Sequence, residues 1–323
     1  IIGNLPPKEG RILYMACVDP HLVSGADVVI DSNPKLVESL EKVQTAFLRR
    51  LLGLGAYSMR APLFTELGLI PLSYRRIILA LRYVGYLVDP KTSPYARAAL
   101  EDSYNLYLNS HQGYWMDLAL VMSKLRYPVA LPGLTGLTPD LCADLAKEVH
   151  KSALKHLDGE VQASTRLYLL HDRLEPLKDE APQKITLILR HYLELVTNPN
   201  HRKAITRLLV SQHPLAIERM RYKSRYHRVE VPRDLRVCRF GCREIESVEH
   251  ALFFCKKKTE LVECRRGFVN AMQGFDPTVL TVAPWNATRV LRGLIFRRDT
   301  VCQVAKYAYK VFAIFNGEVM VWP

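Results

Sequence analysis

The residues with the clearest chemistry are three cysteines and one histidine that lie close together in the 323-residue chain. Cys238, Cys242, His250 and Cys255 follow the pattern C-x3-C-x7-H-x4-C. Three thiolates and one imidazole make a complete tetrahedral ligand set for Zn²⁺, with no position left for a catalytic water. The pattern therefore predicts a closed, structural zinc site, whose binding free energy is largely folding free energy for this region.

Two short elements must bring these four ligands together. A tight turn that contains Gly241 would let Cys238 and Cys242 chelate one ion, and Ser247 is placed to cap a helix that starts at Val248. The five-residue step from His250 to Cys255 is about 140° around an ideal α-helix, so the two side chains cannot face one ion from it. We therefore expect this helix to be short or distorted before Cys255.

The alternative interpretation of the cluster is three unrelated buried thiols and a surface histidine. Cys264 is a possible substitute ligand, although its position favours a helix. The other three cysteines (Cys17, Cys142 and Cys302) are expected to be core or surface thiols without a role. Seven cysteines at irregular spacing do not form a disulfide framework, so reduced thiols in a nuclear or cytoplasmic compartment are expected.

A strongly basic segment precedes the cluster. Residues 201–239 hold eleven Lys or Arg and three acidic residues, a net charge of 11 − 3 = +8 out of +13 for the chain. The eleven are Arg202, Lys203, Arg207, Arg219, Arg221, Lys223, Arg225, Arg228, Arg233, Arg236 and Arg239. With Tyr222, Tyr226 and His227 interleaved, this composition suits RNA or DNA, because cations displace phosphate counterions and rings stack on bases. A merely solvated basic helix face is the alternative.

Periodicity predicts a mainly α-helical fold. Apolar residues recur at helical spacing, with capping residues or prolines at the ends, over residues 34–51, 73–88, 94–109, 115–125, 139–157, 160–171, 180–196, 199–209, 214–225 and 299–315. Residues 127–139, without charge and rich in proline and glycine, are the best candidate boundary. Short strands are possible at residues 14–17, 27–30 and 318–322.

Several other functions find no support in the sequence. The hydrophobic content of 49% is that of a globular protein, and no apolar stretch is long enough to span a membrane. There is no phosphate-binding glycine loop, no His-Glu-x-x-His helix and no Gly-x-Ser-x-Gly turn. We therefore expect neither a membrane nor a small-molecule substrate as a partner, and no catalytic residue is assigned.

The arrangement of basic segment and cysteine cluster resembles the zinc-binding region that follows the reverse transcriptase of non-LTR retrotransposons. The similar segments are HRKAITRLL (201–209), RMRY (219–222), VPR (231–233) and the cluster itself. Upstream, YMACVDPHL (14–22), VQTAFLRRLLG (43–53) and APLFTELGLIPL (61–72) are similar to the segment after the palm in fungal elements of this kind, which forms the thumb and a helical connector in that family.

The resemblance implies four parts: a thumb-like helical segment (1–126), a linker and helical connector (127–200), a basic arm with a zinc knuckle (201–272) and a C-terminal helical tail (273–323). In such a thumb, Arg49, Arg50, Arg75 and Arg76 would either follow the template–primer path or be solvated helix edges. The family's polymerase also needs a paired Asp-Asp, which this sequence lacks. We therefore expect a fragment, beginning at Ile1, that does not polymerise DNA alone and that works beside a reverse transcriptase core.

Two functional hypotheses from different classes follow. In the first, the chain is a zinc-stabilised fragment of a retrotransposon reverse transcriptase that grips RNA template or target DNA. In the second, it is an α-helical protein-interaction scaffold with a structural zinc and no nucleic-acid role. A decayed, inactive insertion is a third possibility that the sequence does not separate from the first.

Overall fold

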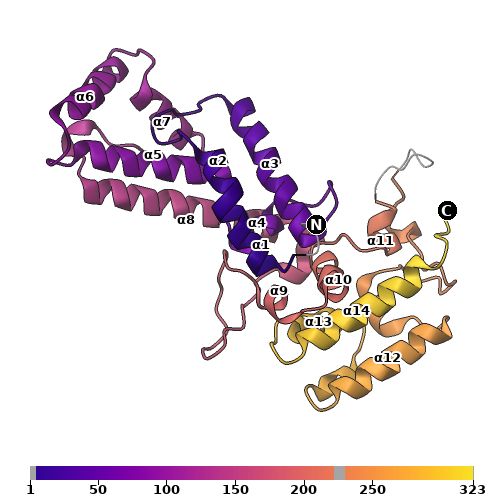
Figure 1. Cartoon of the computed structure of the whole chain (residues 1–323). Helices are drawn as coiled ribbons and strands as arrows, with labels where there is room; N and C mark the ends of the chain where they lie inside the picture. The colour runs from indigo at the N-terminus through magenta and orange to yellow at the C-terminus, as the bar shows by residue number, and fades with distance from the viewer. Residues whose placement is uncertain (1–4, 222–229, 323) are drawn as a thin grey trace.

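The chain folds into an elongated, mainly helical molecule. The computed structural model describes residues 5–221 and 230–322, and long helices occupy one end while the C-terminal helices occupy the other (Figure 1). Over these residues there are no strands, only three isolated antiparallel bridges: Leu67 to Leu189, Glu175 to Gln183 and Val237 to Ile245. The predicted mainly α fold class is thus confirmed at this level.

The first five helical elements surround one face of the main core. They are α1 (Pro7–Leu13), the π-helical turn η2 (Tyr14–Val18), α2 (Asp19–Val23), α3 (Pro34–Leu52) and α4 (Ala61–Leu67). Asn33 caps α3 by accepting a hydrogen bond from the Lys35 N–H, and Gly53 ends it in the left-handed conformation, at φ +65°.

Two of the predicted strands in this part are wrong. Residues 14–17 continue the helix from α1 into α2, and residues 27–29 belong to a turn in which the Val29 N–H donates to the Gly25 carbonyl. Short apolar runs fit either type of structure, because periodicity cannot separate them over so few residues.

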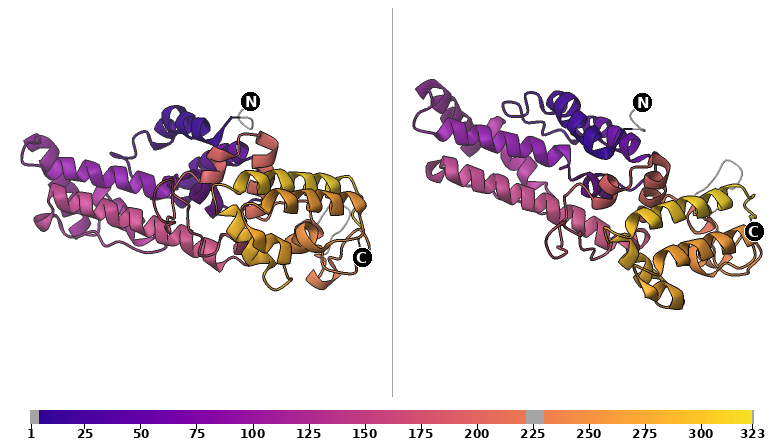
Figure 2. Two further views of the ribbon diagram at one scale, coloured as in Figure 1. Left: turned by 90° about the horizontal axis from the view of Figure 1, so that it is seen from below. Right: turned by 60° about the horizontal axis from the view of Figure 1, so that its bottom comes forward.

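Four helices form a bundle at the far end, which we call the distal bundle: α5 (Leu72–Val88), α6 (Pro94–Leu108), α7 (Tyr114–Ser123) and α8 (Pro139–Ala163). The helices α5 and α8 lie side by side (Figures 1 and 2). Its separate core includes Leu81, Trp115 and Leu118. Four predicted helices are therefore confirmed, and the predicted boundary at 127–139 is a loop with one 3-10 turn, η3 (Leu134–Gly136).

Two helix predictions between the bundle and the C-terminal part need correction. Residues 160–171 are not one helix: α8 extends to Ala163, and a 3-10 segment, η4 (Thr165–Leu170), follows. Residues 180–196 are helical only in α9 (His191–Leu195). The buried Arg190 side chain accounts for the second error, because it donates to the Thr65, Ile185 and Thr186 carbonyls, so that the last two are bonded to a side chain and not to helical N–H groups.

The remaining elements build the C-terminal part. They are α10 (Pro199–Leu209), α11 (Ala216–Arg219), η5 (Arg233–Leu235), the π-helical turn η6 (His250–Phe254), α12 (Thr259–Met272), η7 (Pro277–Thr281), α13 (Ala287–Ile295) and α14 (Val301–Asn316). Helix α14 packs against both α10 and α12. The helix predicted over 214–225 is present only as α11, with 222–229 outside the described residues, and 318–322 is not a strand.

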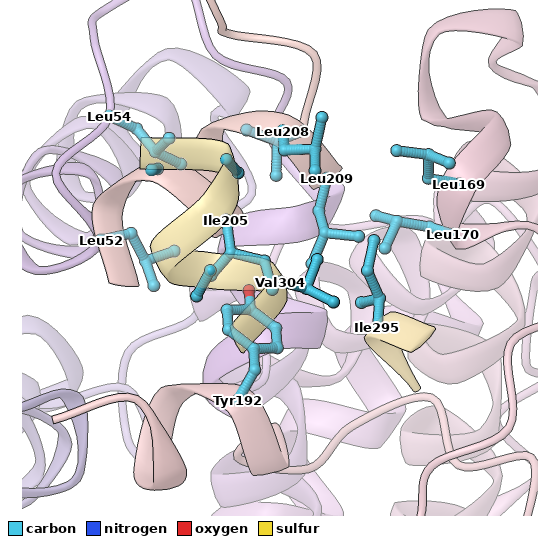
Figure 3. Packing of buried hydrophobic residues seen from close by; sticks show 14 of the residues in the cluster. Leu52, Leu54, Leu169, Leu170, Tyr192, Ile205, Leu208, Leu209, Ile295 and Val304 are labelled. Carbon is cyan, nitrogen blue, oxygen red and sulfur yellow. The ribbon is translucent and has the colours of Figure 1, made fainter. Parts of the chain in front are cut away.

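The main core joins segments from all four predicted parts of the chain. Leu52 of α3, Leu169 and Leu170 of η4, Ile205 of α10 and Val304 of α14 converge there (Figure 3). Each predicted part thus contributes buried residues to one hydrophobic cluster. This shared core does not separate the four parts from one another, so the four-part division stays a prediction.

Candidate metal centre

The four predicted ligands lie in the part of the sequence between α11 and α12, and the structure brings them together at one point. Their ligand atoms all lie within 4.8 Å of one another. Cys238, His250 and Cys255 are buried and Cys242 is half-buried, so the cluster is shielded from solvent on most sides. The sequence pattern is thus assembled in space as a group that can hold one metal ion.

The first two ligands come from a hairpin-like turn. The Val237–Ile245 bridge and the hydrogen bond from the Cys238 N–H to the Glu244 carbonyl, at 2.8 Å, close its base. At the tip, the Gly241 N–H donates to the Cys238 carbonyl, and Gly241 has φ +78°. A residue with a side chain would be strained at this φ, so the expected glycine turn is present.

The other two ligands come from a distorted helix, as the five-residue step required. The backbone N–H of His250 donates to Ser247 Oγ at 3.1 Å, which is the expected cap. From His250 to Phe254 the helix is of the π type, and the Cys255 N–H donates to the His250 carbonyl at 2.8 Å. This i→i+5 bond widens the turn, so that His250 and Cys255 face the same point.

The distances fit a tetrahedral ion that binds sulfur. Cys255 Sγ lies 3.8 Å from Cys238 Sγ and 3.5 Å from Cys242 Sγ. Two thiolates at the Zn–S length of about 2.3 Å with a tetrahedral angle would be about 3.8 Å apart, whereas a disulfide bond is about 2.05 Å long. In addition, Nε2 of buried His250 has no hydrogen-bond partner in the part of the chain that the structure describes, which is expected of an atom reserved for a metal.

The thiols also influence one another's ionisation. The hydrogen bond from Cys238 lowers the pKa of the Cys255 thiol to about 4. Donating that hydrogen bond, together with burial, raises the pKa of Cys238. A cation in the cluster would favour the thiolate form of all three cysteines, because it stabilises their negative charge.

Sequence analysis missed the side chains that support the cluster. Arg265 of α12 donates to the Leu252 and Cys255 carbonyls, both at 2.8 Å, and Tyr307 of α14 also donates to the Leu252 carbonyl. These donors satisfy carbonyls at the π-helical turn that an α-helix would pair internally. An arginine ten residues after the last ligand of a predicted site is a weak signal, so only the structure reveals this role.

Three of the eleven predicted nucleic-acid-binding cations have structural roles instead. Arg202 donates to the Val196 and Thr197 carbonyls at the end of α9, and Arg236 donates to the Val231 and Ile217 carbonyls. Arg239, with 4% of its side chain exposed, pairs with fully buried Glu246 at 2.7 Å. Because buried guanidinium groups engaged in this way are not available to phosphate, we leave these three out of the proposed binding surface.

Five of the other eight predicted cations lie within the described residues. Lys203, Arg219 and Arg233 are exposed, whereas Arg207 donates to the Gly53 carbonyl and Arg221 pairs with Glu218 at 3.1 Å. Lys223, Arg225 and Arg228 lie outside the described residues. The described cations thus leave three exposed positions from the predicted set.

The remaining candidates also have defined places. Cys264 lies on α12 outside the four-residue cluster, Cys142 is buried in the distal bundle, and Cys17 and Cys302 are exposed. Three of the arginines proposed for a template–primer path are engaged within the chain: Arg49 with Ser58, Arg75 with Asp19, and Arg76 with Asp31. Arg50 is exposed.

Comparison with known proteins adds no relative. No family model matches the chain, and neither a curated protein nor a solved structure matches it. In the part of the chain that the structure describes, no helix combines the length and the apolar character needed to cross a membrane.

Proposed function

We propose that the chain is a nucleic-acid-binding module, stabilised by a structural Zn²⁺ on Cys238, Cys242, His250 and Cys255. The observation that carries the proposal is the closed Cys3His cluster that follows a segment with a net charge of +8. Zinc would hold the hairpin turn and η6 together, and the fixed turn would anchor the end of the basic segment. No catalytic role is proposed for any residue.

Exposed cations beside the cluster support this function. Besides Arg219 and Arg233, the side chains of Arg243, Lys256 and Lys257 are exposed, and none of these five forms an ion pair within the described residues. Cations that lack acidic partners can neutralise phosphates at little cost, because no existing pair must be broken.

The resemblance to the zinc-binding region of non-LTR retrotransposon reverse transcriptases leads to a narrower version of the proposal. In it, the chain grips RNA template or target DNA beside a polymerase core supplied by another part of the protein. The assembled cluster agrees with this version, although the same cluster would also suit the alternative, a helical scaffold that binds another protein and has no nucleic-acid role.

The salt dependence of binding separates these functions. Neutralising about six phosphates gives a slope of log K against log salt of about −5 on a duplex and about −4 on a single strand. Reversing Arg219, Lys223 and Arg225 to Glu should abolish this binding, whereas reversing the exposed lysines Lys8 and Lys35 should not. A slope near zero, or equal loss in both variants, would remove the nucleic-acid function and favour the scaffold.

A further inference from the structure

A groove of about 1000 Å³ lies directly against the metal cluster. Cys242 and His250 contribute to one wall, so the groove keeps its shape only while the hairpin turn and η6 stay together. Its volume is at the upper end of the range for sites that hold one small ligand. One or two unpaired nucleotides can enter such a space, whereas the stacked pairs of a duplex cannot.

The charges around the groove favour an anion. Five cations and three carboxylates line it, a net charge of 5 − 3 = +2. Arg166 and Arg221 share the Glu218 carboxylate, at 3.3 and 3.1 Å. The other three cations, Arg233, Lys256 and Lys257, are exposed and form no ion pair with a described residue. They are therefore placed to receive a phosphate.

Two of the three carboxylates are already occupied. Glu249 accepts hydrogen bonds from Tyr168 Oη at 3.0 Å and from Thr288 Oγ1 at 2.7 Å, and Glu218 holds the two arginines. Of the three, only Glu244 is exposed, and its carboxylate has no hydrogen-bond or ion-pair partner among the described residues. Repulsion of an incoming phosphate is thus limited to one position.

A neutral, unpartnered histidine lies in the same groove. His213 is 2% exposed and stacks on Phe312 at a centroid distance of 5.7 Å, and its Nδ1 has no hydrogen-bond partner among the described residues. Burial, with the charges of Arg166 and Arg221, lowers the pKa of His213 to about 3, so the ring is uncharged at neutral pH. A buried polar atom without a partner is costly, and a ligand that hydrogen-bonds to it would remove that cost.

From these observations we infer that the groove binds an unpaired nucleotide of a single strand, with its phosphate at Arg233, Lys256 and Lys257 and its base near His213. Half-buried Phe254 and Tyr168 also line the groove and offer ring faces for stacking. An acidic peptide would meet the same cations, but it has no base edge for the His213 ring. This inference rests on the proposed nucleic-acid function and specifies the form of nucleic acid.

The test compares four fluorescent probes on the full metal-loaded chain: oligouridylate, oligothymidylate, a duplex of equal length and oligoglutamate. Wild type should bind both single strands more tightly than the duplex, and oligoglutamate weakly. His213→Phe, which keeps the ring stack on Phe312, should weaken single-strand binding about three- to tenfold and leave duplex binding unchanged. Lys256→Glu with Lys257→Glu should reduce the salt slope on single strands by about 1.4.

Matched controls separate the possible failures. Lys8→Glu with Lys35→Glu makes the same charge change on α1 and α3 and should leave the single-strand preference intact. If the Lys256/Lys257 variant weakens duplex and single strands equally and His213→Phe changes nothing, the groove inference is wrong while the proposed function stands. If oligoglutamate binds as tightly as the single strands, the groove is a peptide site. If no nucleic acid binds, the proposed function itself is wrong.

Discussion

The distal bundle and the metal-binding segment, residues 236–255, are stabilised in different ways. The bundle has four helices whose buried residues are almost all apolar, with Leu81, Trp115 and Leu118 at its centre. The metal-binding segment has a hairpin turn and one π-helical turn, and it buries Arg236, Arg239 and Glu246. The bundle is held by hydrophobic burial, whereas the segment combines a few buried apolar residues, such as Val248 and Leu252, with a buried ion pair and a cluster that can hold a metal ion. This difference predicts that a metal chelator will unfold the metal-binding segment and leave the distal bundle folded.

The largest expected effect is local unfolding when the metal is removed. Structural zinc contributes roughly 10–16 kcal/mol in small zinc-binding peptides, so we expect its loss to outweigh the packing of Val248 and Leu252 against the main core. A chelator should therefore remove hydrogen-exchange protection from the amides of Cys238 and Cys255, whose N–H groups close the hairpin and the π-helical turn. Amides in α5 and α8 should stay protected. Equal loss of protection in both regions would contradict the comparison.

The next largest effect concerns the buried ion pair of the metal-binding segment. Arg239→Ala leaves the Glu246 carboxylate buried without its guanidinium partner, and breaking such a pair costs about 3–5 kcal/mol. Urea unfolding measures this loss of the free energy of unfolding. Arg219→Ala, at an exposed position on α11, is the matched control and should change stability by no more than about 0.5 kcal/mol. Equal effects would show that Arg239 is not structural.

A cavity made by mutation in the distal bundle tests whether hydrophobic burial stabilises the bundle independently of the metal. Leu81 is fully buried, so Leu81→Ala should destabilise the protein by about 2–5 kcal/mol. The loss should be the same with and without chelator, because the bundle does not depend on the metal. Thermal unfolding in both conditions measures it. A loss that disappears on chelation would mean that the bundle and the metal-binding segment unfold together.

The smallest effect is a pH dependence at the junction between the two regions. Burial alone would raise the pKa of Glu175, but hydrogen bonds and charges from His191 and Arg190 outweigh it and lower the pKa. A lowered folded-state pKa gives stability that is present above the unfolded pKa and is lost as pH falls through the folded pKa. The stability difference between wild type and Glu175→Gln should therefore narrow in acid. Glu148→Gln, at an exposed site, should show no such narrowing.

The sequence predicted regular and locally constrained parts of the fold well. Helices α3, α5 and α14 have long apolar stripes with clear ends, and all three were expected. The distortion before Cys255 was also predictable, because the helical angle between His250 and Cys255 excludes a straight helix. In each case the residues that determine the structure are close to one another in the sequence, within a few helical turns.

Features set by contacts distant in sequence were not predictable. The helix expected at 180–196 is replaced as far as Arg190 by irregular backbone, where buried Arg190 pairs with Glu175 and donates to the Ile185 and Thr186 carbonyls. A count of charges along the chain placed Arg202, Arg236 and Arg239 on the nucleic-acid surface, whereas carbonyls and Glu246 hold them inside. His213 was not noticed, because a histidine without a partner is recognisable only when its surroundings are known.

The most direct test of the account is the metal content of the purified full chain, measured beside Cys238→Ser and Cys264→Ser. The account predicts one zinc per chain in wild type and in Cys264→Ser, and none in Cys238→Ser. Folded wild-type protein without zinc, or loss of zinc in Cys264→Ser, would contradict the assignment of Cys238, Cys242, His250 and Cys255 as the metal ligands.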